Sequence, residues 1–206
     1  MVEMIKLKSL IILLSILILF SSFIYANQKE MKRLEGKKIL MIIGSKDFRD
    51  EELLEPKKIF EDEGAKVVIA SSTLEPIKGM LGKIIKADIL IDDVKVDDYD
   101  AIIFVGGIGA KEYWENTTAH KIAKEAIEKD KKLGAICLAP VILAKAGVLK
   151  DKKATVWKSE RRQLTDNGAQ YTGKYLEVDG NIITADGPES ARYFGLAILD
   201  TLLKPK

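Results

Sequence analysis

The stretch LGAICLAPVILAKAGVL, residues 133–149, decides the fold. It begins with a short run of apolar residues, which is typical of a strand covered on both faces. Pro140 then starts a helical pattern with almost no loop before it. A strand that passes directly into a helix requires a sharp turn, and Cys137, the only cysteine of the chain, lies at this turn.

The same alternation of apolar runs and amphipathic segments continues on both sides of this stretch. Strands are predicted at residues 37–44, 65–72 and 101–107, one or two hairpin strands at 77–93, and a hairpin at 174–185. Helices are predicted at residues 51–64, 117–132, around 159–168 and at 189–203. Strands that alternate with helices form parallel βαβ units. The sequence therefore predicts an α/β fold, a doubly wound sandwich with a mostly parallel central sheet and helices on both faces, in one domain from residue 36 to 206.

The composition argues against several classes of function. Lys and Arg number 33 and Asp and Glu number 31, which gives a net charge of +2, and no basic block lies in the predicted domain. Nucleic-acid binding therefore has no electrostatic support. One cysteine excludes an internal disulfide, and the single histidine, His120, has no second soft ligand nearby. We expect no metal and no cofactor.

The N-terminus differs from the rest of the chain. Residues 10–26 are apolar and uncharged, follow Lys6 and Lys8, and precede a polar linker at residues 27–35. Residues 1–26 are typical of a signal peptide with Ala26 as its cleavage residue, or of a retained anchor, because roughly 20 apolar residues span a bilayer. Basic residues after the run outnumber those before it, which favours a cytoplasmic domain if the anchor is retained. We expect a membrane-anchored or exported protein, and the sequence leaves the side of the membrane open.

Cys137 has two interpretations. Free cysteine is among the most buried residue types, so Cys137 could fill the core. However, Ala135 and Ala139 leave the room that a nucleophile elbow needs, and such an elbow exposes its side chain at the sheet edge. The N-terminus of the following helix also favours a thiolate. Together these features favour a reactive cysteine.

Glu52 interrupts the apolar stripe of its helix. At about 100° per residue it falls in the same stripe as Leu53, Pro56 and Ile59. It could be stabilised there by the amides of the helix N-terminus. Alternatively, burial raises the pKa of its carboxyl, which stays protonated and donates a hydrogen bond to the sulfur of Cys137.

Gly106 and Gly107 end the central strand, residues 101–107. Such a pair can form a simple turn, or it can let backbone N–H groups come close to a ligand. In the second case, the N–H groups of Gly107 and Leu138 could together form an oxyanion hole.

Four segments resemble the DJ-1/PfpI (ThiJ/PfpI) superfamily, in the same order. They are DFRDEELLEP (47–56), AIIFVGGIGA (101–110), GAICLAPVILAKAGVL (134–149) and VDGNIITADGP (178–188). The resemblance covers nearly the whole chain after about residue 36. It implies a flavodoxin-like sandwich, with Cys137 as the reactive cysteine and Glu52 as its carboxyl partner. It also implies that Gly107 and Leu138 are the oxyanion donors.

One position departs from the peptidase-like branch of this superfamily, which has histidine directly after the cysteine. Leu138 stands there instead, and His120 is expected at the surface or boundary of the preceding helix. Without an adjacent base, a Cys-His catalytic pair has no support. We therefore do not expect peptidase activity.

Two functions from different classes remain. The first is a cysteine-dependent enzyme, a hydrolase or a glyoxalase or deglycase, that acts on small carbonyl or acyl substrates. The second is a non-enzymatic redox sensor or protective protein whose Cys137 is oxidised to a sulfinate. Tyr113, Trp114 and Trp157 are candidates to line the pocket. As the resemblance implies, we also expect a homo-oligomer.

Overall fold

The computed structural model of the chain describes residues 32–204, and its central element is a seven-stranded sheet. The strand order is β10-β11-β7-β6-β1-β2-β5, and every neighbouring pair is parallel except β10 and β11. The strands are β1 (Lys38–Ile42), β2 (Lys66–Ser71), β5 (Ile89–Leu90), β6 (Ala101–Phe104), β7 (Lys132–Ile136), β10 (Leu176–Asp179) and β11 (Ile182–Ala185). This arrangement confirms the predicted α/β fold with a mostly parallel sheet.

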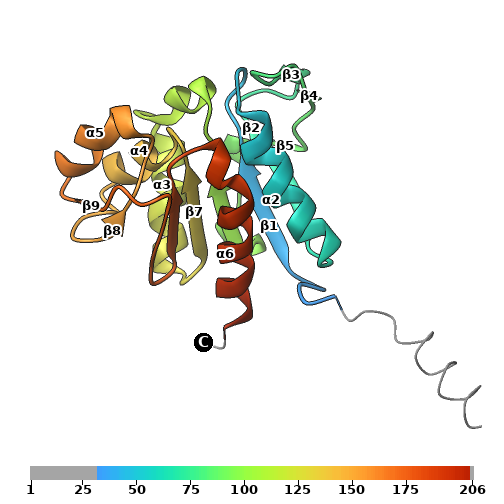
Figure 1. Ribbon diagram of the computed structural model, residues 1–206. Helices are drawn as coiled ribbons and strands as arrows, with labels where there is room; N and C mark the ends of the chain where they lie inside the picture. Colours follow the sequence, from blue (N-terminus) through green and yellow to red (C-terminus); the bar gives the residue numbers. More distant parts are fainter. Residues whose placement is uncertain (1–31, 205–206) are drawn as a thin grey trace, which may run out of the picture. The chain divides into compact units, whose positions relative to one another are not determined.

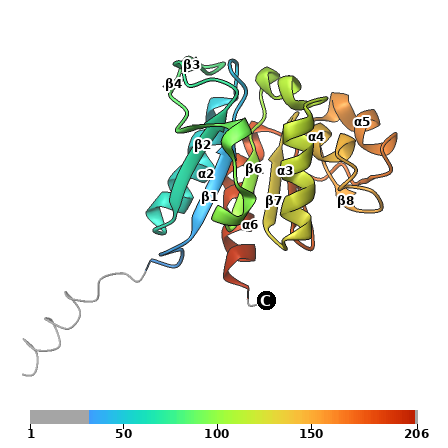
Figure 2. The same cartoon turned by 180° about the vertical axis from the view of Figure 1, so that it is seen from behind.

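Helices cover both faces of the sheet. Helices α2 (Asp50–Asp62) and α6 (Ala191–Leu203) lie together on one face, and α3 (Thr117–Glu128) lies on the other (Figures 1 and 2). Gly195 lets α6 approach α2 closely, because a Cβ atom there would lie 2.9 Å from the Cα atom of Pro56. The short helices α4 (Pro140–Lys145) and α5 (Arg161–Thr165) lie on the side of β7 that faces away from β1, toward the end of the sheet with β10 and β11.

Several short elements lie outside the main sheet. The segment predicted as hairpin strands divides into β3 (Ile77–Lys78) and β4 (Ile84–Ile85), which pair only with each other, and β5, which joins the main sheet. The parallel pair β8 (Lys153–Ala154) and β9 (Gln170–Tyr171) was not predicted, because two-residue strands show no periodicity. The 3₁₀ helices are η1 (Ile91–Asp93), η2 (Val96–Asp98), η3 (Ile108–Tyr113), η4 (Lys158–Glu160) and η5 (Pro188–Ser190).

The carboxyl ends of β1, β6 and β7 meet at one edge of the sheet, at the top of Figure 1. These strands form the centre of the core, and β6 is buried along its whole length. The edge at which parallel strands end is where ligands bind in open α/β sheets. The core therefore fixes the position of the turns that follow β1, β6 and β7.

Two residues that precede the predicted boundary at residue 36 already contact the domain. Leu34 is fully buried and its N–H donates to the carbonyl of Glu63 at 2.8 Å, while Arg33 forms an ion pair with the Glu63 carboxylate. A single leucine among polar residues has no periodicity that could reveal this packing. The predicted signal peptide or anchor, residues 1–26, lies outside the described residues, as does most of the linker. Between residues 32 and 204, no helix has the length and apolar character needed to cross a membrane.

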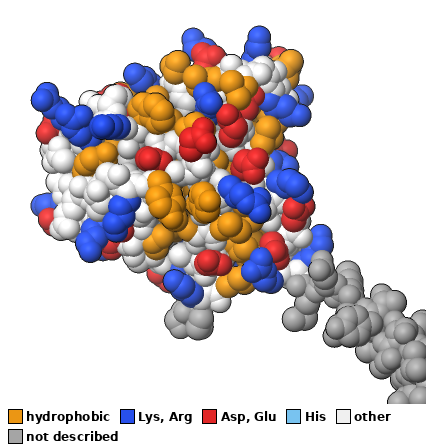
Figure 3. Space-filling view, in the orientation of Figure 1, with side chains coloured by type: hydrophobic (Ala, Val, Ile, Leu, Met, Phe, Trp, Pro, Cys, Tyr) orange, Lys and Arg blue, Asp and Glu red, His pale blue; other side chains and the backbone are white. Residues whose placement is uncertain are grey.

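The surface carries charges of both signs. Figure 3 shows hydrophobic side chains in the middle of the face that carries α2 and α6, with acidic and basic side chains around them. Tyr175 and Tyr193 are among the exposed hydrophobic residues and pack edge to face with ring centroids 5.7 Å apart. This face carries no extended patch of acidic or basic side chains alone, in agreement with the low net charge.

Candidate active site

Cys137 occupies a strained turn between β7 and α4. Its φ angle is +61°, in the left-handed region that residues with a Cβ atom rarely adopt. Hydrogen bonds hold the backbone on both sides, since the N–H of Cys137 donates to the carbonyl of Ala185 and its carbonyl accepts from the N–H of Trp157, each at 2.9 Å. Backbone strain of this kind persists only where the surrounding structure enforces it, and it is concentrated at functional sites. The sharp turn predicted at this cysteine is present.

Glu52 lies in the first turn of α2 and is 0% exposed. Within residues 32–204, neither of its carboxyl oxygens has a hydrogen-bond partner of ordinary geometry. The polar groups that act on its carboxyl include the thiol of Cys137 and the backbone amide of Gly106. A carboxylate without partners would be very costly at such a position. The geometry therefore favours the protonated carboxyl.

Gly106 separates the two side chains and has to be small. A Cβ atom at this position would lie 2.3 Å from Oε2 of Glu52 and 2.6 Å from the Cβ atom of Cys137. Real Cβ atoms do not approach other atoms this closely, so any larger residue would push the two side chains apart. The glycine at the end of β6 therefore allows the carboxyl and the thiol to meet.

The pKa values of the two groups are linked. Burial raises the pKa of Glu52 to about 8. Burial, together with the negative charge of an ionised Glu52, raises the pKa of Cys137 to about 12. The expectation that the helix N-terminus would favour a thiolate is thus opposed by the loss of hydration. When two titratable groups interact this strongly, the first proton leaves the pair and belongs to neither group alone.

Two backbone amides determine where the remaining charge is best stabilised. The N–H groups of Gly107 and Leu138 act on the sulfur of Cys137 and lower its pKa. Cys137 is 8% exposed and lines a pocket, whereas Glu52 is completely buried. Taken singly, the pKa values of about 8 for Glu52 and about 12 for Cys137 would place the first charge on Glu52. The two amides and the access of Cys137 to the pocket favour the opposite arrangement, a thiolate that accepts a hydrogen bond from a protonated Glu52.

The turn that carries Gly107 is packed tightly against the loop before α2. The φ angle of Gly107 is +88°, and a Cβ atom there would lie 2.4 Å from the backbone nitrogen of Arg49. On the other side of the site, the indole N–H of Trp114 donates to the carbonyl of Leu138 at 3.1 Å. The two peptide units that carry the predicted oxyanion donors are held by other hydrogen bonds. The N–H of Arg49 donates to the carbonyl of Gly106 at 3.1 Å, and the N–H of Trp157 donates to the carbonyl of Cys137 at 2.9 Å.

A pocket of about 200 Å³ opens onto the sulfur. Its lining consists of Arg49, Met80, Gly107, Ile108, Cys137, Leu138, Trp157 and Pro188. Three of the four predicted site residues are in this lining, and the fourth, Glu52, lies behind Cys137 in the core. The structure therefore brings all four together, while their roles in a reaction stay predictions.

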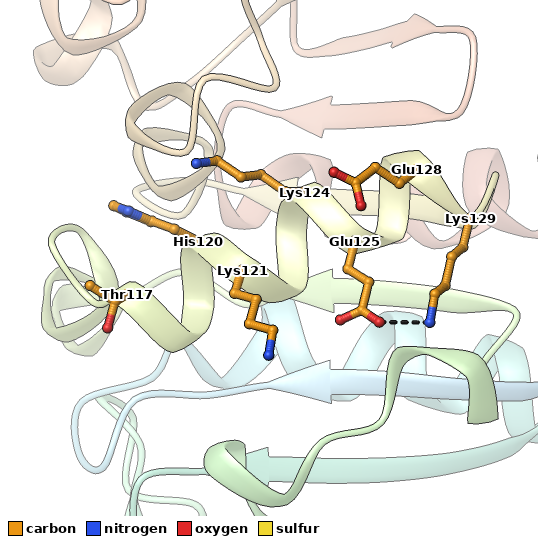
Figure 4. Close-up of a pocket in the computed structure, with 7 residues that line it drawn as sticks. All are labelled: Thr117, His120, Lys121, Lys124, Glu125, Glu128 and Lys129. Carbon is orange, nitrogen blue, oxygen red and sulfur yellow. Dashed lines mark ion pairs between the residues drawn. The ribbon is translucent and has the colours of Figure 1, made fainter.

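The other candidate residues lie elsewhere or contribute indirectly. Tyr113 is buried, and its hydroxyl donates to the carbonyl of Ile43 at 2.9 Å. His120 lines a different hollow of about 550 Å³ along α3, together with lysine and glutamate side chains of the same helix (Figure 4). Its Nε2 atom lies 2.8 Å from the carbonyl oxygen of Trp114. The hollow along α3 is larger than the pocket at Cys137, but none of its lining residues is a cysteine and none is buried.

Sequence reasoning missed half of the pocket lining, namely Arg49, Met80, Ile108 and Pro188. Each comes from a loop or a short 3₁₀ element, where no periodicity indicates the direction of a side chain. Arg49, Ile108 and Pro188 lie within segments that carry recognisable motifs, and this position could have suggested them, whereas no motif includes Met80. Among residues 32–204, no group of three or more His, Cys, Asp or Glu side chains could hold a metal ion.

The chain is similar to known proteins over most of its length. The model of the DJ-1/PfpI family matches residues 37–201. The uncharacterized protein MJ0967 of Methanocaldococcus jannaschii is 47% identical over 96% of this chain and 98% of its own length. Deglycase PfpI of Pyrococcus furiosus is 32% identical over 72% of this chain and 90% of its length, and the glutathione-independent glyoxalase DJR-1.2 of Caenorhabditis elegans is 28% identical over 82% and 91%.

A solved structure shows the same fold. The ThiJ/PfpI domain protein of Brachyspira murdochii superposes with a TM-score of 0.80 at 32% identity, and the match covers 83% of this chain and all of that one. The family model, the sequence relatives and the solved structure agree with one another. This chain belongs to the DJ-1/PfpI family.

Proposed function

We propose that the protein is a cysteine-dependent enzyme of the glyoxalase or deglycase type that acts on small carbonyl substrates. The observation that carries the proposal is the fully buried Glu52 carboxyl, which lacks ordinary hydrogen-bond partners and lies beside Cys137. A protonated carboxyl next to a thiol that opens onto a pocket can deliver one proton to an oxygen bound there. Relatives named deglycase and glyoxalase add support.

The first step is addition of the thiolate of Cys137 to the aldehyde carbon of a 2-oxoaldehyde. The S–C bond forms and the carbonyl π bond breaks. The oxygen takes the proton of Glu52, and the N–H groups of Gly107 and Leu138 stabilise the charge that develops on it. The product is a hemithioacetal beside an ionised Glu52.

The second step is an internal redox change that needs no external oxidant. The Glu52 carboxylate removes the C–H proton of the hemithioacetal carbon, which leaves an enediolate, and then returns this proton to the neighbouring carbon. The hydroxyl proton of the first carbon moves to the oxygen of the neighbouring carbon, whose carbonyl becomes a hydroxyl group. The first carbon becomes a thioester carbonyl. Water then hydrolyses the thioester, which releases a 2-hydroxy acid and restores the thiol.

The test is the conversion of methylglyoxal to lactate by the full-length protein. Cys137→Ser should abolish conversion, and Glu52→Gln should lower kcat by about a hundredfold or more, because proton transfer is lost. Glu55→Gln is the matched control, since Glu55 is exposed on the same helix. Conversion that survives in Cys137→Ser would refute the proposal.

The same assay separates the enzyme from the redox sensor. Both functions use Cys137 and Glu52, so only turnover distinguishes them. If peroxide oxidises Cys137 to a sulfinate while methylglyoxal is not consumed, the sensor function replaces the enzymatic one.

We propose further that the protein is a homo-oligomer and is anchored or exported through residues 1–26. Light scattering of the purified protein tests the first point. Fractionation of cells, with N-terminal sequencing of the mature chain, tests the second.

A further inference from the structure

The pocket at Cys137 has an apolar wall built from three separate segments. Met80 comes from the β3–β4 turn, Ile108 from the start of η3, and Trp157 from the segment after β8. These side chains are 39%, 56% and 47% exposed. Large apolar side chains that remain exposed around a nucleophile are typical of a surface that a ligand covers.

Trp157 is held in place beside the thiol. Its ring packs on the backbone of Gly187, where a Cβ atom would lie 2.8 Å from Cζ3 and 2.9 Å from Cε3 of the indole. Its backbone N–H donates to the carbonyl of Cys137 at 2.9 Å. The ring therefore forms a preorganised flat wall, which lowers the entropic cost of stacking a ligand against it.

The charge in the pocket is already compensated. Arg49 is the charged residue of the lining, and its guanidinium binds both carboxylate oxygens of Glu51, from Nε at 2.8 Å and from Nη2 at 3.0 Å. This bidentate pair uses two of the five N–H donors of Arg49 and offsets its charge. The pocket therefore has little net positive charge to attract an anionic substrate.

The volume of the pocket exceeds what methylglyoxal needs. About 200 Å³ corresponds to roughly seven water molecules at about 30 Å³ each. Methylglyoxal, with its single methyl substituent, would leave water against the indole of Trp157. An aromatic substituent would displace that water and cover the exposed ring.

We propose that this pocket selects 2-oxoaldehydes that carry an uncharged aromatic substituent, and that Trp157 determines this specificity. The inference rests on the proposed function, because Cys137 has to attack the aldehyde carbon by the steps given above. It extends that function by assigning the substituent to the apolar wall formed by Met80, Ile108 and Trp157.

The first arm of the test compares two substrates with the full-length protein. Initial rates of mandelate formation from phenylglyoxal and of lactate formation from methylglyoxal give kcat/KM for each. We expect phenylglyoxal to be preferred by about tenfold or more. Trp157→Ala should remove most of this preference, and Trp157→Phe should retain most of it. Tyr193→Ala is the matched control, because Tyr193 is a similarly exposed aromatic residue outside the pocket.

The second arm does not depend on turnover. The rates at which N-phenylmaleimide and N-ethylmaleimide alkylate Cys137 are each divided by the rate with free cysteine. We expect the phenyl reagent to be favoured about tenfold in the wild type and much less in Trp157→Ala.

The outcomes separate the two claims. If neither aldehyde is converted but the maleimide preference holds and depends on Trp157, the proposed function fails and the aromatic preference of the pocket stands. Three results would overturn the inference. The two maleimides could react at equal normalised rates, Cys137 could fail to be alkylated, or Tyr193→Ala could reduce the aromatic preference as much as Trp157→Ala does.

Discussion

The carboxyl of Glu52 and the side chain of Cys137 meet across Gly106, where a single added Cβ atom would lie 2.3 Å from Oε2 of Glu52 and 2.6 Å from the Cβ atom of Cys137. One residue comes from the first turn of α2 and the other from the turn after β7, 85 positions apart in the printed sequence (137 minus 52). Their proximity couples their protonation, and this coupling leads to the first two predictions.

The reactivity of Cys137 should follow the titration of the pair. The rate of alkylation by iodoacetamide should rise with pH with a midpoint near 8, because burial raises the pKa of Glu52 to about 8 and the first proton leaves the pair there. Measured rates against pH, with the modified residue identified by mass spectrometry, check this. A rate that stays flat through pH 8 and rises only toward 12 would show that the charge rests on Glu52. Glu52→Gln should move the midpoint upward, because the thiol then titrates alone in a buried site.

Glu52 should also make the stability of the protein depend on pH. The pKa of Glu52 is raised from 4.5 to about 8 on folding, so the folded state holds the proton more tightly. This contribution to stability is fully present below pH 4.5 and is lost as the pH rises to about 8. Relative to the wild type, Glu52→Gln should therefore gain up to about 1.4 kcal/mol per pH unit across this interval. Urea unfolding at a series of pH values checks the trend, and Glu55→Gln should not show it.

Gly107 should tolerate no side chain. Gly107→Ala would place a Cβ atom 2.4 Å from the backbone nitrogen of Arg49 and 2.5 Å from the carbonyl oxygen of Asp47. Gly147 is the matched control, since its φ of +80° is close to the +88° of Gly107 but no atom lies within 4 Å of its added Cβ. We expect Gly147→Ala to cost about 1 kcal/mol of unfolding free energy, and Gly107→Ala to cost about 1–3 kcal/mol more and to reduce turnover. Similar losses in both variants would contradict the close packing at Gly107.

The wild type should be a poor peptidase. Cleavage of an amide requires a group that accepts the thiol proton as a base and then, as an acid, protonates the leaving amine. Leu138, which can do neither, occupies the position next to the thiol. Release of a fluorophore from peptide amides should be near background. Leu138→His should raise it in a manner that depends on Cys137, whereas Leu138→Gln, which is polar but not a base, should not. Strong wild-type cleavage that survives Cys137→Ser would contradict this assignment.

The boundary of the folded domain can be tested with two truncations. A chain that begins at residue 32 keeps Leu34, which is fully buried, and the ion pair between Arg33 and Glu63. A chain that begins at residue 36 loses both. We expect the longer chain to fold, and the shorter one to be less stable by about 1.5–3 kcal/mol, the value of one buried leucine. Equal unfolding midpoints in urea would place the boundary at residue 36.

The sequence was sufficient to predict those features that depend on local patterns. Apolar runs alternate with amphipathic segments, and this alternation alone predicts a parallel sheet between helices. The small residues Ala135 and Ala139 predicted the turn at Cys137, and the helical period placed Glu52 on the inward face of its helix. Each of these patterns lies within one segment of about a dozen residues, so no other part of the chain is needed to recognise it.

The tertiary structure alone decided which loops surround the thiol and how the thiol titrates. Met80, Ile108 and Pro188 reach the pocket from three separate segments, and only the packing of the finished sheet brings them together. Backbone amides lower the pKa of Cys137, and burial raises it. The balance of these two effects depends on every group that excludes water from the site. A helix N-terminus can be recognised in a sequence, but the extent of desolvation is a property of the folded chain. The sequence therefore predicted Cys137 as a candidate nucleophile and Glu52 as its candidate carboxyl partner, whereas the pocket wall and the charge state of the pair arise only from tertiary packing.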